Sequence, residues 1–386
     1  MERLWTKSFI LMTVGTLFLF IAFYMLYPTL PLFIKQIGGN ETQIGLSMGA
    51  FMLTSVMVRP IVGGLLDRYG RRPFIVWGLA LFIVAMYLYD WIGGIVVLMG
   101  LRILHGMSWA VSSTAINTAV TDMIPSARRG EGMGWFSTSM TLAMAFGPMV
   151  GIWVIQDLSY HALFRFAVVF SAVALILTFG AKMPFRPQSG ARRIELFEKS
   201  VLPISTSVFF MFIAYGGITT FVPLFADSIK VNSGVFFLAF AATLALSRPL
   251  SGKLSDRYGE TFIIVPALVI TILALISLSF STGLLGVLAS AVLYGIGFGS
   301  AHPALQSATL RLARPDRKGV ANASLATATD LGIGLGAIML GWVSQYTSYS
   351  FLFAVSAVTV AFSMLVFTFF VKRSLKTNLR LTSIDV

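Results

Sequence analysis

An ionisable residue inside a long apolar stretch of the sequence needs a partner or a water-filled cavity, and three such residues, Asp330, Arg102 and His105, are the main candidates for chemistry. Asp330 lies about ten residues into one stretch, roughly 15 Å deep and near the midplane of a bilayer. Arg102 and His105 lie three residues apart in another stretch, also near the midplane, so they share one face of a helix. A carboxyl group that is neutral when buried and charged when wetted can carry a proton across a membrane. We therefore expect these three residues to couple protons or to contact substrate.

Each of the three residues also has a purely structural interpretation. Asp330 could make a hydrogen bond within the glycine-rich packing face that follows it in the sequence. Arg102 could hold a substrate carboxylate or tune a neighbouring acid, because its guanidinium group stays charged. His105 could relay a proton, since an imidazole titrates near neutral pH, or it could be a satisfied packing residue. The sequence leaves both interpretations open for each residue.

A second set of aromatic and polar residues could line a substrate cavity or pack between helices. Trp109 and Ser113 continue the helix face that carries the arginine and the histidine. Pro303 follows His302, so a helix distortion could also explain that polar position. The full set is Tyr24, Tyr27, Trp109, Ser113, Tyr215 and His302.

The residue types that build cofactor, metal and nucleophilic sites are sparse in this chain. It has no cysteine, which excludes thiolate metal sites and thiol nucleophiles, and it has no His-Glu metal motif or His-x-x-x-x-Asp pair. The glycine runs at 295–299 and 332–336 lie inside apolar stretches with no strand before them, so they predict helix packing rather than nucleotide binding. We expect no cofactor and no metal, and the absence of a catalytic cluster argues against a membrane-embedded enzyme.

The elements that must position these residues are membrane helices. The chain has 386 residues, of which 57% are hydrophobic and 11% charged, against about 25% charged in an average soluble domain. With a mean hydropathy of +0.86, it has too few polar residues to cover a water-soluble globule. Apolar runs of about 20 residues, the length that crosses a bilayer, occur twelve times. They span residues 9–34, 43–66, 74–89, 92–123, 133–155, 162–181, 202–226, 233–254, 262–281, 284–310, 320–346 and 349–371.

The excess positive charge follows from the orientation of these helices. The chain carries 28 Lys and Arg against 15 Asp and Glu, for a net charge of +13. With the amino terminus inside the cell, 24 of the 28 basic residues fall on the cytoplasmic side. The exceptions are Lys35, Arg165 and Lys230 in or near outer loops and Arg102 within a span. This pattern predicts a plasma-membrane protein with both termini in the cytoplasm. Because the basic residues are dispersed over short loops, we expect no nucleic-acid partner.

An internal repeat with a constant offset of 189 residues divides the chain into two halves. The segment 59–70 recurs at 248–259, with the Arg-Pro and Asp-Arg-Tyr-Gly groups of both copies in register. The same offset relates His105 to Tyr294 and Gly147 to Gly336. The repeat predicts two six-helix bundles in the same orientation, with a cavity near the midplane between them. We expect an amino-terminal bundle over 1–182, a cytoplasmic linker over 183–201, a second bundle over 202–372 and a cytoplasmic tail over 373–386.

Three motifs resemble those of the major facilitator superfamily. The run Gly63-x-Leu65-x-Asp67-Arg68-x-Gly70-Arg71-Arg72 is similar to the family's signature loop, and 252–259 is its weaker second copy. Arg102-x-x-x-Gly106 resembles the second motif of the family. Gly147-Pro148-x-x-Gly151 resembles the antiporter motif of its proton-coupled exporters, although Ala143 stands where the family more often has glycine. The resemblance implies an all-α fold of twelve transmembrane helices in two pseudo-symmetric six-helix bundles.

The resemblance also implies roles for residues near the helix ends. It implies an ion-pair latch between the halves, which a basic residue near the start of the eleventh span completes. The residues concerned are Gly63, Asp67, Arg68, Gly70, Arg71, Asp122, Asp256 and Arg257. The second copy departs from the pattern, because Glu260 and Thr261 stand where the first copy has Arg71 and Arg72. The antiporter motif implies a tight helix seal that favours exchange over leakage.

These observations predict a monomeric secondary transporter that exports small organic molecules in exchange for protons, by rocking of the two halves. The first span has no acidic residue, which leaves room for zwitterionic or anionic substrates such as a metal-chelating, opine-like metabolite. A proton-driven nutrient importer is the alternative within the same class. A scaffold protein without transport activity is the alternative from another class.

Overall fold

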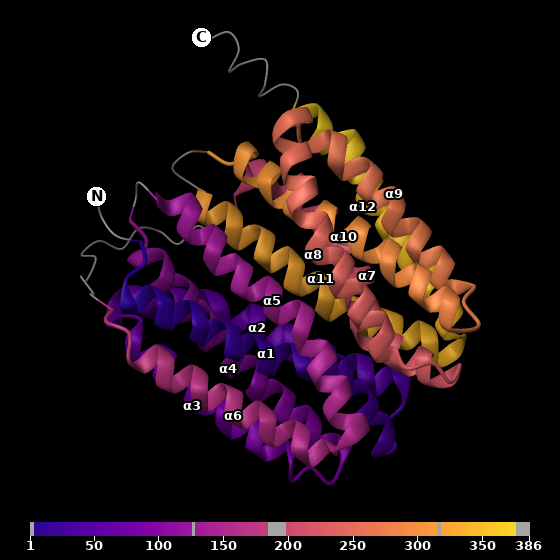
Figure 1. The fold of residues 1–386 in the computed structure, drawn as a ribbon, viewed down its shortest axis with the longest axis horizontal. Helices are drawn as coiled ribbons and strands as arrows, with labels where there is room; N and C mark the ends of the chain where they lie inside the picture. The colour runs from indigo at the N-terminus through magenta and orange to yellow at the C-terminus, as the bar shows by residue number, and fades with distance from the viewer. Residues whose placement is uncertain (1–3, 126–127, 184–197, 315–317, 376–386) are drawn as a thin grey trace. The chain divides into compact units, whose positions relative to one another are not determined.

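The computed structural model describes residues 4–125, 128–183, 198–314 and 318–375, and all regular structure in these residues is helical. Twelve helices are long and apolar enough to cross a membrane, which confirms the predicted all-α class (Figure 1). They are α1 (Lys7–Gln36), α2 (Glu41–Tyr69), α3 (Arg72–Tyr89), α4 (Ile95–Met123), α5 (Arg129–Asp157), α6 (Tyr160–Phe179), α7 (Leu202–Ser228), α8 (Ser233–Tyr258), α9 (Glu260–Ser279), α10 (Leu284–Leu312), α11 (Lys318–Tyr346) and α12 (Tyr349–Val366). Most of the predicted linker and tail lies outside the described residues.

Local sequence explains where several helices begin and end. Ser159 caps α6, because its side chain accepts a hydrogen bond from the backbone N–H of Ala162. The helices α2 and α8 stop at Gly70 and Gly259, both of which have a φ of 85°. That left-handed conformation favours glycine, so the two copies of the repeat end their helices in the same way.

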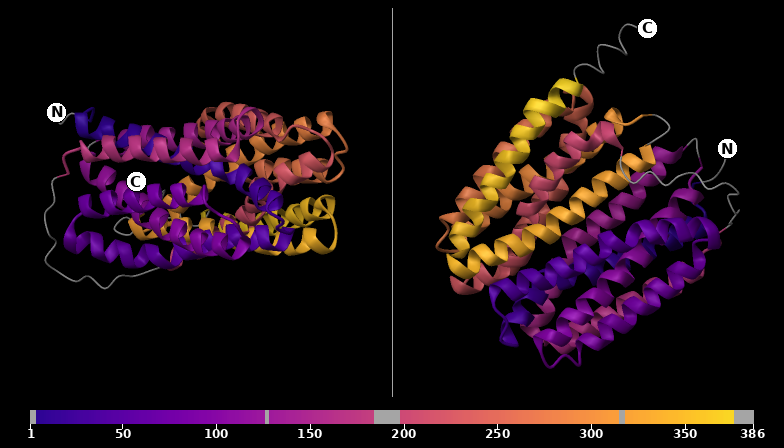
Figure 2. Two further views of the ribbon diagram at one scale, coloured as in Figure 1. Left: turned by 90° about the horizontal axis from the view of Figure 1, so that it is seen from below. Right: turned by 180° about the vertical axis from the view of Figure 1, so that it is seen from behind.

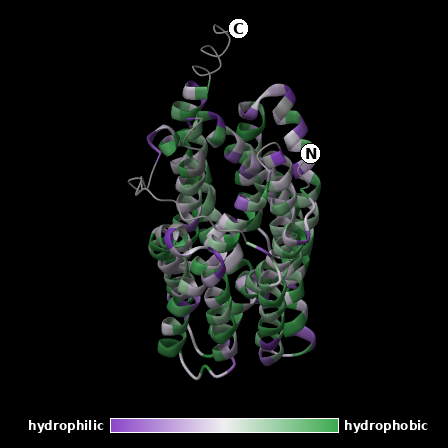
Figure 3. Ribbon diagram, turned by 90° about the vertical axis from the view of Figure 1, so that its left-hand side faces the viewer, coloured by the Kyte–Doolittle hydropathy of each residue, from purple (hydrophilic) through white to green (hydrophobic). Residues whose placement is uncertain are grey.

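The chain forms two compact units. Unit 1 comprises Met1–Gly39 and Ala50–Ile194, and unit 2 comprises Asn40–Gly49 and Glu195–Val386. The first residues of α2 therefore group with unit 2, where the Tyr349 hydroxyl donates to a Glu41 carboxylate oxygen at 2.9 Å. Within each unit the helices run side by side along much of their length (Figure 2). Hydrophobic residues cover most of that length (Figure 3).

In unit 1, α1 packs against α5 and α6, and α3 packs against α4 and α6. Close approach of helices depends on glycine at several crossings, as two examples show. A methyl group at Gly151 of α5 would collide with the backbone carbonyl of Met25 in α1. A methyl group at Gly106 of α4 would collide with the carbonyl of Phe51 in α2. Small residues let such backbones touch, which is the usual basis of helix association in lipid.

In unit 2, α7 packs against α11 and α12, and α10 packs against α8 and α9. The glycine runs are packing positions, as predicted: a methyl group at Gly332 or Gly336 would lie 2.6 Å from a backbone carbonyl oxygen of α7. One crossing repeats the geometry of unit 1. Gly295 of α10 packs against the Phe240 carbonyl of α8, and both residues lie 189 positions after the Gly106 and Phe51 pair. The repeat seen in the sequence therefore extends to matching helix contacts.

Candidate functional site

A buried polar cluster joins α3 and α4 in unit 1. Arg102 and His105 face the hydroxyl of Tyr89, and the three residues are 3%, 1% and 1% exposed. The Tyr89 oxygen lies 3.2 Å from His105 Nδ1 and 3.5 Å from an Arg102 guanidinium nitrogen. That same nitrogen lies 3.4 Å from His105 Nδ1. The structure thus brings together the two residues that share a helix face and adds a third that the sequence did not single out.

Aromatic rings enclose this cluster. The Arg102 guanidinium lies over the Phe51 ring, 4.4 Å from its centroid, which is the geometry of a cation–π interaction. Phe51 and Phe82 meet the His105 ring edge-on, at 4.7 and 4.8 Å. The cluster therefore keeps one permanent positive charge buried beside aromatic rings. Tyr89 is the last residue of α3. The cluster therefore lies closer to the end of this helix than the midplane position that the sequence predicted for Arg102 and His105.

Aromatic residues of α1 and α4 continue from this cluster. Trp109 stacks on Phe23 with ring centroids 4.0 Å apart and planes 11° from parallel. Tyr24 and Tyr27 both contact the Phe23 ring, at 5.2 and 5.0 Å. Ser113 donates its hydroxyl to the Trp109 carbonyl at 2.6 Å. In unit 1 these predicted cavity residues pack against one another, and Trp109 is only 5% exposed.

The corresponding residues of unit 2 form a second aromatic cluster. Tyr215 stacks on Phe298 at 4.8 Å, and His302 lies 5.1 Å from the Phe212 ring. Phe298 and His302 lie 189 positions after Trp109 and Ser113, so the two clusters occupy matching faces of α4 and α10. Tyr215 and His302 therefore belong to one aromatic cluster, in which both contact Phe298.

Asp330 lies near the middle of α11 and is 9% exposed. It precedes Gly332 and Gly336, through which α11 packs against α7. A carboxyl group in such a place favours its neutral form unless a cation or water reaches it. Asp330 belongs to unit 2, whereas Arg102 and His105 belong to unit 1.

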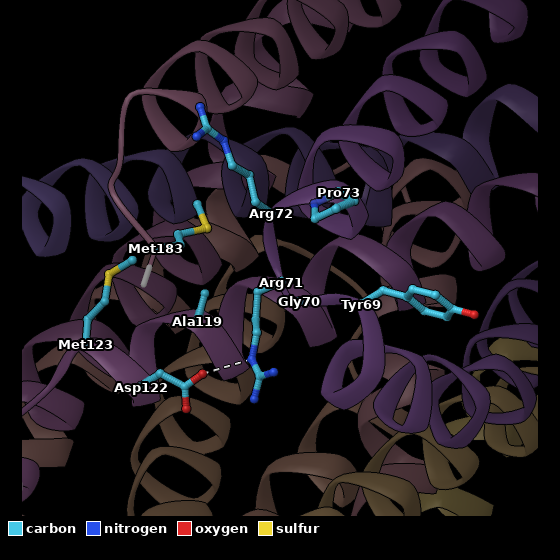
Figure 4. A pocket seen from close by; sticks show the side chains of 9 residues that line it. All are labelled: Tyr69, Gly70, Arg71, Arg72, Pro73, Ala119, Asp122, Met123 and Met183. Atoms are coloured by element: carbon cyan, nitrogen blue, oxygen red, sulfur yellow. Dashed lines mark hydrogen bonds and ion pairs between the residues drawn. The ribbon is translucent and has the colours of Figure 1, made fainter. Parts of the chain in front are cut away.

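The predicted signature loop carries an ion pair inside unit 1. Arg71 Nε lies 2.9 Å from an Asp122 carboxylate oxygen at the end of α4, and another Arg71 nitrogen donates to the Leu66 carbonyl at 2.9 Å. Arg72 points away from this pair, beside a small pocket (Figure 4). The pocket is lined by Tyr69, Gly70, Arg71, Arg72, Pro73, Ala119, Asp122, Met123 and Met183.

The other described residues of the predicted latch make local contacts or none. Arg68 and Arg257 each lie over the tyrosine that follows them, at 5.3 and 5.2 Å from the ring centroid. The structure does not describe the side chains of Asp67 and Asp256. A methyl group at Gly63 would meet nothing within 4 Å. A latch between the halves stays a prediction.

Unit 2 has an ion pair at the same register with inverted polarity. Glu260, which opens α9, lies 3.0 Å from Arg311 of α10 and accepts a hydrogen bond from Ser307 at 3.2 Å. These two charged residues lie 189 positions after Arg71 and Asp122. In both pairs the residue after the glycine is the buried member, with 13% and 5% of its side chain exposed, and its helix partner is 47% and 45% exposed. Applying the offset to both partners would have revealed this pair in the sequence.

The predicted antiporter motif forms the contact between α5 and α1. Gly147 packs on Tyr24 and Gly151 packs on Met25, while Pro148 between them is buried. The helix α5 runs through Pro148 without a break, from Arg129 to Asp157. The motif therefore forms a close packing contact between these two helices within unit 1, and its role as a seal stays a prediction.

A further polar cluster, which sequence reasoning missed, joins the ends of α3 and α6. His161 Nδ1 bonds to an Asp90 carboxylate oxygen, and Arg165 Nε lies 3.7 Å from the other oxygen. The partners are 71 residues apart, so no spacing rule connects them. Among the described residues, no group of three His, Cys, Asp or Glu could hold a metal ion.

Comparisons with known proteins agree with this architecture. The family model described as Major Facilitator Superfamily matches residues 12–337 and 233–384. The staphylopine export protein of Staphylococcus aureus strain Mu50 is 27% identical over 388 residues, covering 92% of this chain and 94% of that protein. The quinolone resistance protein NorA of the same strain is 24% identical over 336 residues, covering 84% and 86%.

Among solved structures, a bacterial homologue of the human lysosomal transporter Spinster, in an inward-facing and occupied conformation, has a TM-score of 0.81. It is 15% identical, and the match covers 96% of this chain and 98% of that one. At this identity the likeness concerns the fold alone.

Proposed function

The chain belongs to the major facilitator superfamily, a family of membrane transporters, and we propose that it exports small organic molecules in exchange for protons. Export is supported by the names of two relatives that match most of the chain, a staphylopine export protein and a quinolone resistance protein. We take staphylopine and a quinolone as the first substrates to test. The two units would alternate between states open to either side of the plasma membrane, with both chain termini in the cytoplasm.

The observation that carries the proton coupling is the buried carboxyl group of Asp330. It is a buried ionisable side chain within a segment, Ala323–Tyr346, that is long and apolar enough to cross a membrane, and the neighbouring glycines pack directly on α7. A carboxyl group there takes up a proton when the site is dry and loses it when water enters. If exposure alternates between the two sides, each cycle moves a proton into the cell while substrate leaves it.

Arg102 supplies the fixed positive charge of the proposed mechanism. Its guanidinium group cannot lose its proton, so it can hold a substrate carboxylate or stabilise the charged form of an acid. The tight contact of α5 with α1 through Gly147 and Gly151 supports exchange over leakage, because the two backbones approach closely at these positions.

Transport in inside-out membrane vesicles tests the proposal. With the vesicle interior acidified, exchange predicts accumulation of norfloxacin or staphylopine and a substrate-dependent loss of the pH gradient. Asp330→Asn keeps the shape of the side chain and removes its titration. We expect this variant to lose gradient-driven accumulation while it still exchanges labelled for unlabelled substrate without a gradient.

Two results would count against the proposal. Normal gradient-driven accumulation by Asp330→Asn would show that another group carries the proton. Accumulation in right-side-out vesicles with an acidic exterior would show an importer that moves protons and substrate together.

A further inference from the structure

The Nδ1 atom of His105 faces hydrogen-bond donors from two directions. An Arg102 nitrogen lies 3.4 Å away and the Tyr89 hydroxyl oxygen lies 3.2 Å away. A guanidinium group has donors and no acceptor, so Nδ1 must be the accepting atom of this contact. The Tyr89 oxygen can accept from Arg102, at 3.5 Å, and direct its own hydrogen to Nδ1. The Arg102 contact therefore requires Nδ1 without a hydrogen, and the Tyr89 hydroxyl can donate to the same atom.

The hydrogen of the neutral imidazole must then be on Nε2. That atom is buried and has no hydrogen-bond partner among the described residues. A second proton, on Nδ1, would place an N–H group against an Arg102 N–H group 3.4 Å away. The other rings around His105 belong to Phe51 and Phe82, which carry no charge that could offset this repulsion.

We propose that Tyr89 is a positioning residue that holds His105 as a neutral donor with its hydrogen on Nε2. His105 then contributes a directed N–H group, which an oxygen atom of a substrate or a water molecule can accept when the site opens, and it does not relay protons. Only the contact with substrate rests on the proposed transport function. The placement of the hydrogen on Nε2 does not. The charged and titratable groups that face the imidazole are Arg102 on α4 and Tyr89 on α3.

Contacts with α6 explain why Tyr89 can act as a positioning residue. Its ring stacks on Phe164 of α6, with centroids 5.3 Å apart and planes 19° from parallel. The next residue, Asp90, is held by His161 and Arg165 of the same helix. The end of α3 is thereby fixed on α6, and Tyr89 as a whole is only 1% exposed. These contacts leave the tyrosine little freedom to turn away from His105.

Nitrogen NMR of the full-length protein, labelled with 15N at histidine, tests the proposal without any substrate. The chain has three histidines, and the signal lost in His105→Gln identifies residue 105. We expect His105 to show a hydrogen on Nε2 and none on Nδ1 from about pH 5 to pH 8, the range in which an ordinary imidazole titrates. In Tyr89→Phe the Nδ1 resonance should move toward that of a ring nitrogen that accepts no hydrogen bond.

A hydrogen on Nδ1, or a titration of His105 within that range, would overturn the proposal. An unchanged Nδ1 resonance in Tyr89→Phe would overturn the role of the tyrosine. None of these NMR measurements depends on transport of substrate or protons. Their results therefore stay interpretable even if the proposed transport function is wrong.

A transport comparison tests the role of the donor itself. His105→Met removes the N–H group at similar size and should lose vesicle accumulation of the substrate. His105→Gln again presents an N–H group at the end of the side chain and should recover most of that loss, with an unchanged pH profile. Equal loss in both variants, or no loss in either, contradicts a donor role.

Discussion

Arg102 is a full positive charge that unit 1 keeps almost completely out of water. The residue is 3% exposed, and its guanidinium lies over the Phe51 ring while one nitrogen contacts Tyr89 and His105. A planar, weakly hydrated cation can make these contacts together, whereas a compact ammonium group cannot. The side chain is thus part of the packing of α4 as well as a charge.

Replacing Arg102 by lysine should therefore destabilise the protein although the charge is kept. The cation–π contact of a desolvated arginine is worth about 2 kcal/mol, and we expect Arg102→Lys to lose a large part of it. Thermal unfolding of the purified protein measures the effect. Arg165→Lys is the matched control, because Arg165 is 76% exposed and should tolerate the change. Equal melting temperatures of the two variants would contradict the packing role of Arg102.

The sequence predicts contacts within a helix better than contacts between helices. The spacing of three residues was enough to place Arg102 and His105 on one face. Tyr89 could not be identified in this way, because an aromatic residue at a helix end is common at membrane interfaces and carries no specific signal. The bond between Asp90 and His161 depends on how α3 and α6 pack, and no pattern in a single sequence fixes that packing.

At the scale of helices, the close packing of α1 on α5, which we propose acts as a seal, depends on the absence of a side chain at Gly151. Its neighbour is the backbone carbonyl of Met25, which cannot move aside as a flexible side chain could. Gly63 of α2 has open space around it instead, because a methyl group there meets nothing within 4 Å. The two positions allow the packing effect to be separated from the general preference of helices for alanine.

Gly151→Ala should lower the melting temperature and Gly63→Ala should not. Both changes gain roughly 0.5–1 kcal/mol of helix propensity, but overpacking at Gly151 costs about 1–3 kcal/mol. Gly151→Ala should also let the pH gradient of proteoliposomes collapse faster, because a forced separation of α5 from α1 opens a path for water. A variant as stable and as tight as Gly63→Ala would show that the seal does not need the glycine.

At the scale of the whole molecule, the proposed orientation can be tested directly because the chain has no cysteine. Leu158 lies exposed between α5 and α6, and Arg314 lies exposed after α10. A membrane-impermeant maleimide should label Leu158→Cys in intact cells and label Arg314→Cys only after the membrane is opened. The reverse pattern would place both termini outside and contradict the explanation of the net charge of +13.

The two ion pairs of opposite polarity suggest how the duplicated halves avoid pairing with each other's helices during folding. Arg71 binds Asp122 in unit 1, and Glu260 binds Arg311 in unit 2. If the turn after α2 docked on α10, Arg71 would meet Arg311, and the converse error would bring Glu260 against Asp122. Each misplacement sets like charges together, which disfavours it relative to the native pairing.

Exchanging the charges tests this idea with pairs that each remain complementary. The variant R71E/D122R gives both units the same polarity, so wrong docking is no longer repulsive, although both native pairs can form. We expect a native-like melting temperature, because the exchanged charges still form a complementary pair whose second member is about half exposed, but a lower yield of active protein on refolding. Adding E260R/R311E makes the two polarities opposite again and should restore the yield. If the fourfold variant refolded no better than R71E/D122R, the ion pairs would stabilise only their own contacts and would not prevent docking of the wrong helices.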